Sequence, residues 1–212
     1  MLPKLVAWSL VLASPSSALA QAHPPTTNSS AQQAWAFALT ADGYVAPNEN
    51  GYVSPILVAD RAWLHVEARY NYENLKTGSL WAGYNFRLGK RLVLNVTPMI
   101  GGVFGRTTGF APGFEASLTY NKVQLSFSNE YVFDTGDQSS SFYYDWPELT
   151  YSPIKWLHVG LVAQRTKAYH TSFDTQRGFL FGVSHKKIEF TTYVFNAGWT
   201  DPTVVLEAGF SF

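Results

Sequence analysis

The sequence predicts an all-β protein, a transmembrane antiparallel up-and-down β-barrel of about twelve strands. Apolar and polar residues alternate in segment after segment, which is the period of a β-strand. Short basic turns also alternate with longer polar loops along the chain. Aromatic residues make up 16% of the chain and charged residues only 14%, whereas soluble domains carry roughly 25% charged residues. Such a surface is expected to face something other than water over much of its area.

The alternation gives each predicted strand one apolar and one polar face. It is clear in residues 62–72 (AWLHVEARYNY), in residues 122–133 (KVQLSFSNEYVF) and in residues 203–212 (TVVLEAGFSF). Asn129 is an exception, because it falls on the apolar face of its strand. Helical periodicity of useful length is not found, so strands are predicted throughout.

Two kinds of connection are expected to separate the strands. Short basic turns lie about thirty residues apart, a hairpin-sized repeat, at Asp60-Arg61, Gly89-Lys90-Arg91, Asn121-Lys122, Ile154-Lys155 and Lys186-Lys187. The longer connections are PNENG, ENLKTG, GRTTGFAPG, DTGDQSSS, KAYHTSFDTQ and WTDP. Tight turns at one end and larger loops at the other are typical of membrane barrels. The count of strands lies between ten and twelve, because Pro47 and Pro55 interrupt the first two.

The N-terminus has the pattern of an export signal. Residues 1–20 carry one Lys, an apolar run over 5–13 and an Ala-Leu-Ala ending, so cleavage is expected after Ala20. Residues 21–33 are predicted to be a flexible lead-in and 34–212 the barrel. The apolar run is too short for a membrane helix, which needs roughly 20 residues. Cysteine is absent, so no disulfide framework is expected.

Hydrocarbon imposes closure on a spanning sheet, because every backbone N–H and C=O must be paired internally. We therefore expect the last strand to pair with the first, near residues 34–46. Aromatic residues gather beside the connections, as in the interfacial girdles of such barrels. The turn-side girdle is predicted to contain Trp63, Phe86, Tyr120, Tyr151, Trp156 and Phe212. The loop-side girdle is predicted to contain Tyr44, Tyr70, Phe104, Phe133, Tyr144, Phe195 and Trp199.

The alternating last strand, with Phe212 as its final residue, resembles the C-terminal insertion signal of Gram-negative outer-membrane β-barrel proteins. This resemblance implies localisation to the bacterial outer membrane, contact with outer-membrane lipid and recognition of the last strand by the barrel-assembly machinery. A secreted soluble β-sandwich also alternates. It would need a polar outer face, and the low charge of this chain disfavours it.

The polar face is expected to line the barrel interior. Counting from the short turns places six side chains near mid-membrane: Glu67, Arg69, Glu115, Glu130, Glu148 and Glu207. Either Arg69 pairs with neighbouring Glu in a plugged polar core, or the lumen is hydrated and its carboxylates favour cations and neutral solutes. Twelve strands lie between barrels that fill themselves and barrels that hold open water. The predicted function is passive, porin-like diffusion of small hydrophilic solutes through this layer.

The size and strand number are similar to those of small porins for acidic oligosaccharides, such as the oligogalacturonate-specific family. That resemblance implies a lumen lined with basic residues, and this chain departs from it by placing five carboxylates against one guanidinium. No cofactor or metal is implied. The mature chain is nearly neutral, with 14 basic residues once Lys4 is removed against 15 acidic ones, so nucleic-acid binding is not expected.

Two other functions stay open. His170 and Ser172 resemble the His-x-Ser pair of outer-membrane phospholipase A and of the lipid A deacylases, which implies a lipid-modifying hydrolase. Alternatively, a closed barrel binds a ligand or partner through its outer loops, above all through residues 134–146 (DTGDQSSSFYYDW). The oligomeric state is not predicted, because an apolar outer face serves monomers and trimers alike.

Overall fold

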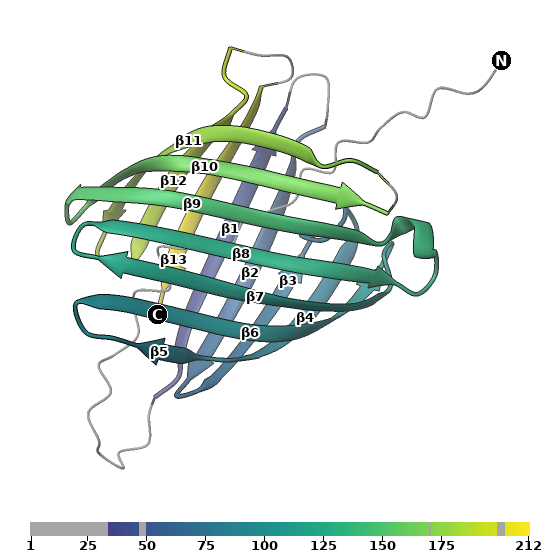
Figure 1. Cartoon of the computed structure of the whole chain (residues 1–212), viewed down its shortest axis with the longest axis horizontal. Coiled ribbons are helices and arrows are strands. Elements are labelled where there is room, and N and C mark those ends of the chain that lie inside the picture. Colours follow the sequence, from purple (N-terminus) through teal and green to yellow (C-terminus); the bar gives the residue numbers. More distant parts are fainter. Residues whose placement is uncertain (1–33, 47–49, 170, 199–201) are drawn as a thin grey trace.

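A closed antiparallel sheet forms the fold (Figure 1). The computed structural model describes residues 34–46, 50–169, 171–198 and 202–212. The strands are β1 (Ala36–Val45), β2 (Tyr52–Arg61), β3 (Leu64–Tyr70), β4 (Thr77–Tyr84), β5 (Phe86–Leu88), β6 (Leu92–Gly105), β7 (Gly109–Tyr120), β8 (Val123–Asp134), β9 (Phe142–Ile154), β10 (Leu157–Ala168), β11 (Asp174–His185), β12 (Ile188–Phe195) and β13 (Thr203–Ser211). A short 3-10 helix, Gln138–Ser140, lies between β8 and β9.

The barrel has twelve strands, because β4 and β5 are two parts of one strand. Both pair with β6 in the same register, from Gly83↔Met99 to Phe86↔Val96. The interruption falls opposite Pro98, which has no N–H to contribute to the ladder. Thirteen segments therefore make twelve strands, and the predicted fold class is confirmed.

The sheet closes between its first and last strands. β1 pairs with β13 over eight residue pairs, from Ala38↔Ser211 to Val45↔Val204. Beyond them, the Phe37 N–H donates to the Phe212 carbonyl at 3.1 Å, and the Phe212 N–H donates to the Phe37 carbonyl at 2.9 Å. The two rings stack with centroids 5.5 Å apart. This seam leaves the sheet without an edge, as a membrane-spanning sheet requires.

The two ends of the barrel differ as predicted. At the turn end, two or three residues join each pair of strands: 62–63, 89–91, 121–122, 155–156 and 186–187. At the loop end the connections are 46–51, 71–76, 106–108, 135–141, 169–173 and 196–202. The loop predicted at 105–113 is mostly wrong, because β7 begins at Gly109. The Gly and Pro residues of this segment favoured a loop prediction, but its residues alternate as in a strand. Phe110 and Pro112 face outward and Ala111 faces inward.

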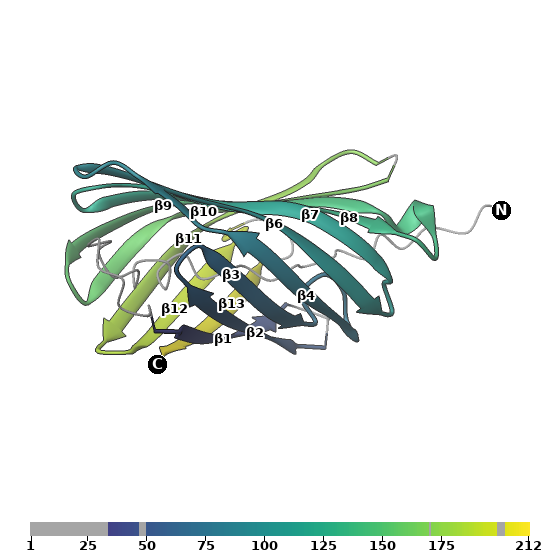
Figure 2. The same cartoon turned by 90° about the horizontal axis from the view of Figure 1, so that it is seen from below.

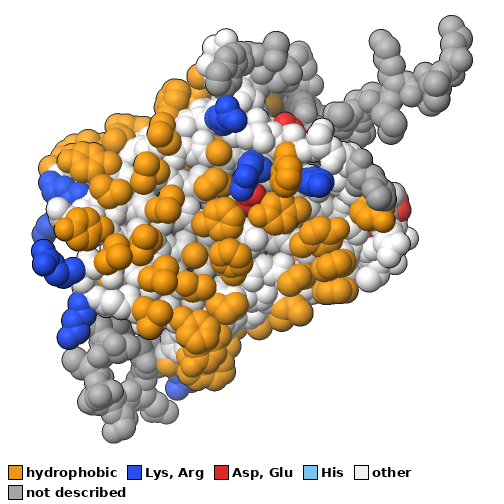
Figure 3. All heavy atoms as spheres, viewed as in Figure 1, with side chains coloured by type: hydrophobic (Ala, Val, Ile, Leu, Met, Phe, Trp, Pro, Cys, Tyr) orange, Lys and Arg blue, Asp and Glu red, His pale blue; other side chains and the backbone are white. Residues whose placement is uncertain are grey.

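The barrel is flattened, with β7 to β10 in one broad wall and β1, β2, β12 and β13 opposite (Figure 2). Side chains that face outward are apolar over most of the surface (Figure 3). Leu80, Ile100 and Leu161 are 58%, 58% and 63% exposed, which suits hydrocarbon and not water. Among the described residues, no helix has the length and apolarity to cross a membrane.

The predicted aromatic girdles are correct at the turn end and partly wrong at the loop end. All six turn-side aromatics are exposed on the outer wall, and so are Tyr70, Phe104 and Phe133 at the loop end. Tyr44, Tyr144 and Phe195, in contrast, are buried inside the barrel. Trp199, Pro47, the predicted signal peptide and the lead-in lie outside the described residues. The interior therefore contains aromatic side chains that their position near the loops had assigned to the outer wall.

The β2–β3 turn offers a test of the backbone. Ala62 is exposed and has a φ of 55°, in the left-handed region that Gly adopts without strain. We expect Ala62→Gly to change the free energy of unfolding by less than about 1 kcal/mol, in the stabilising direction. Ala62→Val should destabilise, because a β-branched side chain disfavours positive φ. Urea unfolding of the refolded barrel, followed by tryptophan fluorescence, measures both. A more stable Val variant would contradict the assigned turn.

Candidate functional site

The candidate site is the layer of charged side chains inside the barrel. Inward-facing residues alternate with the apolar outer set, and the six predicted interior side chains are all on inward-facing positions of their strands. Five of them are buried: Glu67, Arg69, Glu130, Glu148 and Glu207. Glu115 is partly buried. The structure divides them into two groups, one around Arg69 and one around Glu148 and Glu207.

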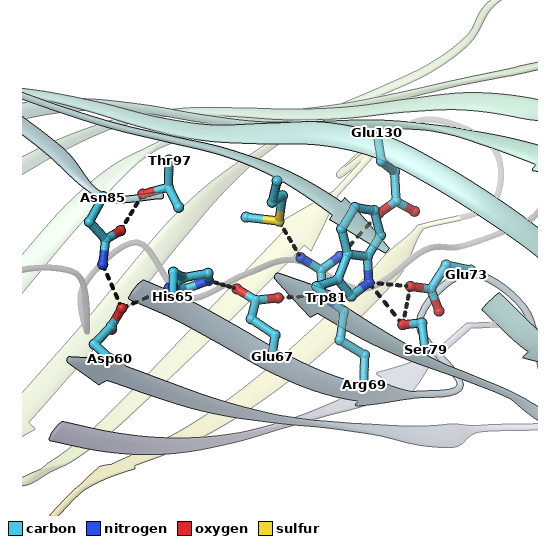
Figure 4. Close-up of polar contacts among 11 residues, drawn as sticks. Asp60, His65, Glu67, Arg69, Glu73, Ser79, Trp81, Asn85, Thr97 and Glu130 are labelled. Carbon is cyan, nitrogen blue, oxygen red and sulfur yellow. Dashed lines mark hydrogen bonds and ion pairs between the residues drawn. The ribbon is translucent and has the colours of Figure 1, made fainter. Parts of the chain in front are cut away.

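Arg69 is the centre of the first group (Figure 4). Its Nε donates to Glu67 Oε2, and its Nη1 donates to Glu130 Oε2 at 3.0 Å. The guanidinium also lies over two rings, with its Cζ 4.4 Å from the Tyr72 centroid and 4.5 Å from the Trp81 centroid. Ion pairs in its plane and aromatic rings at its faces suit the delocalised charge of an arginine and not the point charge of a lysine.

The Arg69–Glu130 ion pair crosses the barrel interior. Arg69 lies on β3 and Glu130 on β8, and β4, β6 and β7 separate these strands in the sheet. Tyr72 makes a second crossing contact, because its ring meets that of Tyr144 on β9 edge to face at 6.2 Å. Both contacts join opposite walls and narrow the space between them. Of the two interior arrangements predicted, this half of the barrel shows the pairing of Arg69 with neighbouring Glu.

Polar contacts extend from Arg69 toward both ends of the barrel (Figure 4). Toward the turn end, His65 lies between Glu67 Oε1 and Asp60 Oδ1, with each ring nitrogen 2.8 Å from a carboxylate oxygen. Asp60 also accepts from Asn85 Nδ2 at 2.7 Å. Toward the loop end, the Trp81 indole N–H donates to Glu73 at 3.1 Å. The network thus follows the barrel axis as well as crossing it.

Three of these side chains have donor atoms close enough for a metal ion. Ligand atoms of His65, Glu67 and Glu115 lie within 4.8 Å of one another, and imidazole with carboxylates is a donor set that Zn²⁺ accepts. Glu115 Oε1 has no hydrogen-bond partner among the described residues. Glu67, however, already binds both Arg69 and His65, so a cation would have to compete with these contacts.

The second group surrounds a cavity of about 270 Å³ at the turn end. Glu148 accepts from the Trp146 indole at 2.6 Å, and Glu207 accepts from the Tyr193 hydroxyl at 3.3 Å. Both carboxylates line the cavity. The wall also includes His158 and Glu189, which approach to 3.4 Å, and the exposed lysines 155, 186 and 187. The cavity therefore has buried carboxylates in its wall and exposed amines among its lining.

Aromatic side chains pack beside Glu148 and Glu207. Trp146 meets Tyr193 and Phe195 edge to face, at centroid distances of 5.4 and 5.1 Å. Phe195 and Tyr144 are fully buried here, although they were predicted in the outer girdle. The inward orientation of Tyr144 could have been predicted from the sequence, because it is an even number of residues from Glu148 and shares its face.

The described structure includes only one member of the predicted hydrolase pair and therefore does not test it. Ser172 lies in the exposed connection 169–173, where its carbonyl accepts from the Thr171 hydroxyl at 3.2 Å. His170 lies outside the described residues. The hydrolase function stays a prediction.

Similar proteins are found among solved structures. No family model and no curated protein matches the chain. The KdgM porin in complex with disordered oligogalacturonate is 12% identical, with a TM-score of 0.60 over 82% of this chain and 99% of that one. A second structure of the KdgM porin is 11% identical, with a TM-score of 0.59 over 82% of this chain and 99% of that one.

The outer membrane protein Omp33 of Acinetobacter baumannii is also similar. It is 12% identical, with a TM-score of 0.50 over 86% of this chain and 100% of that one. At these identities the likeness shows the fold alone. This chain has the fold of bacterial outer-membrane barrels, and the predicted outer-membrane localisation is consistent with that fold.

Gly101 allows the Arg69 group to assemble, and this can be tested against its neighbour. A Cβ at Gly101 would overlap the Trp81 indole, whereas one at Gly102 would have nothing within 4 Å. We expect Gly101→Ala to destabilise the barrel by about 1–3 kcal/mol, because the indole must move from the Arg69 guanidinium. Gly102→Ala should be neutral or slightly stabilising. Urea unfolding and near-UV circular dichroism measure the difference, and equal effects of the two changes would contradict this packing.

Proposed function

We propose that the chain is a narrow porin-like channel for small hydrophilic solutes, with a preference for cations or neutral molecules over anions. The observation that carries this proposal is the charge of the interior layer, where Arg69 is the single cation among Glu67, Glu115, Glu130, Glu148 and Glu207. Arg69 is already paired with two of these carboxylates. Glu148 and Glu207 are the carboxylates of the layer that face the turn-end cavity.

The path begins in that cavity and passes the cluster of Trp146, Tyr193 and Phe195. Carboxylates inside a barrel act on ions more strongly than exposed amines do, because salt screens exposed charges and the low-dielectric wall does not. The buried carboxylates therefore set the sign of the selectivity, and the lysines at 155, 186 and 187 modulate it. The aromatic cluster limits the size of the solute.

The acidic interior argues against an anionic sugar as cargo. The KdgM porin that shares this fold is described in complex with oligogalacturonate, which is a polyanion. A polyanion entering this barrel would meet Glu148, Glu189 and Glu207 in the cavity wall, and like charges repel strongly in a confined space. The proposed solutes are therefore neutral or cationic.

Ion selectivity tests the role of the carboxylates. In planar bilayers under a salt gradient, the refolded chain is expected to prefer cations. Replacing both Glu148 and Glu207 by Gln should reduce that preference, because it removes fixed negative charge from the path. Asp137→Asn is a control, since Asp137 is an exposed loop residue. Hydrogen bonds from Ser139 and Ser140 lower the pKa of Asp137, so this control also removes a charge at neutral pH. A folded but silent barrel, or equal effects of both changes, would contradict the proposal.

Conductance tests the role of the aromatic cluster. Phe195→Ala should raise single-channel conductance severalfold, because it removes a fully buried ring from the aromatic cluster on the proposed path. Phe190→Ala removes the same ring from the same strand, but Phe190 faces outward and is 56% exposed. It should leave the conductance unchanged. An unchanged Phe195→Ala channel would place the path elsewhere in the barrel.

Assembly through the last strand stays a prediction beside these proposals. β13 and Phe212 form the closing seam with β1, so they are required for the closed sheet. Recognition of this strand by the barrel-assembly machinery is not tested by the seam itself.

A further inference from the structure

The apolar outer wall is interrupted by one charged patch on β8 to β11. We call this group the outer patch: Asn129, Asp145, Arg165, Lys167 and Arg177. Strand alternation places all five on the outward face, because Glu130, Tyr144, Gln164, Thr166 and Gln176 face inward between them. Figure 3 shows Lys, Arg and acidic side chains together in the apolar surface near β10. Asn129, the exception to the alternation in its strand, therefore belongs to a larger feature.

Cations exceed acids in the outer patch. Asp145 is fully buried beneath its neighbours and accepts from Arg165 Nε at 2.8 Å. This bond fixes the guanidinium and leaves its two terminal nitrogens without a hydrogen-bond partner among the described residues. Lys167 and Arg177 likewise form no ion pair within the described part of the chain. The patch thus presents three cations and one acid.

The cations surround one exposed aromatic ring. The Arg165 Cζ lies 5.9 Å and the Lys167 Nζ 5.3 Å from the centroid of Phe173. Arg177 pairs with Ala163, and Arg165 pairs with Thr175, so the two arginines are diagonal neighbours on adjacent strands. Their free donors therefore face the same region of the outer surface.

The position of the outer patch matches a lipid headgroup. Arg165 is nine residues above Trp156, or about 23 Å along the barrel axis at 3.3 Å per residue and the usual tilt. The apolar band of a membrane barrel is about 25 Å tall, so the patch lies at its loop-end boundary. Directly below it, Leu161 pairs with Phe179, and both are at least half exposed. Cations above and an apolar strip below suit a phosphate group with acyl chains.

A second copy of the chain is a poorer occupant. Its outer wall would have to supply acids to pair with the three cations. In the described strands, Asp145 is the only acid on the outward face, and it already binds Arg165. A phosphate monoester, in contrast, accepts from guanidinium nitrogens in a bidentate manner and neutralises more than one charge.

We propose that the loop end of β10 and β11 binds the phosphorylated headgroup of a lipid in the surrounding leaflet. Arg165, Lys167 and Arg177 contact the phosphate, and Asp145 positions Arg165. Leu161 and Phe179 contact the acyl chains. The proposal is independent of solute passage through the interior.

The test is lipid binding by the refolded full chain in zwitterionic micelles. The probe is diphosphorylated lipid A, with phosphatidylcholine as the zwitterionic lipid and inorganic phosphate as the headgroup alone. Native mass spectrometry counts bound lipid, and a titration gives the affinity. We expect lipid A to bind, and the triple variant Arg165→Gln, Lys167→Gln, Arg177→Gln to lose about tenfold or more in affinity, because each cation near a membrane surface contributes to anionic lipid binding.

A matched variant removes the same charge at the other end. This variant replaces three exposed turn-end cations, by Lys90→Gln, Arg91→Gln and Lys122→Gln. It should keep the lipid A affinity of the wild type. The single changes Lys167→Gln and Arg177→Gln leave the Arg165–Asp145 pair intact. They should each weaken binding even if the triple variant fails to fold.

Four results would overturn the proposal. In the first, the triple variant binds lipid A as the wild type does. In the second, the turn-end variant loses as much affinity, so that only overall charge matters. In the third, inorganic phosphate competes as well as the lipid, which makes free phosphate the ligand. In the fourth, the triple variant changes the oligomeric state and leaves lipid binding unchanged, which makes the patch an interface between copies.

Discussion

Backbone pairing in hydrocarbon is the constraint on which the rest of this structure depends. A buried N–H or C=O without a partner is costly in lipid, so the sheet must close on itself. The seam between β1 and β13 meets this requirement. Closure then separates the two faces of every strand, one toward lipid and one toward the interior. The charged layer and the apolar wall both follow from the same alternation.

The interior shows how a barrel of this size uses its enclosed space. Twelve strands enclose more room than side chains from one wall can fill, so residues from opposite walls meet. The Arg69–Glu130 pair and the Tyr72–Tyr144 contact are such meetings. They join β3 and the connection that follows it to β8 and β9. Near β9 to β13, buried carboxylates instead line a cavity that reaches the turn end. Within the described residues, the interior is thus both a packed core and a polar chamber.

Strand alternation allowed most of the fold to be predicted from the sequence. It assigned Glu67, Arg69 and Glu130 to the inner face correctly, because the face depends only on residue parity. The partner of Arg69 could not be predicted, since the meeting of β3 with β8 depends on the flattening of the barrel. Tyr144 and Phe195 were wrongly assigned to the outer girdle. The assignment considered their distance from the loops along the strand and not whether their position in the alternation faces inward or outward. The outer patch was missed for a different reason. Asn129 was seen as one exception, and strand register was needed to bring Asp145 and Arg165 beside it.

The arrangement around Arg69 constrains the order in which its two ion pairs can form during folding. Glu67 and Arg69 lie two residues apart on β3, so they can neutralise each other within a single extended strand. Glu130 can meet Arg69 only after β4 to β7 have curved round to bring β8 opposite β3. A nascent hairpin of β3 and β4 therefore carries a charge pair that is already matched when it enters the bilayer. Glu130 gains its partner only when the two walls come together, so this ion pair depends on the curvature of the whole sheet and not on a single strand.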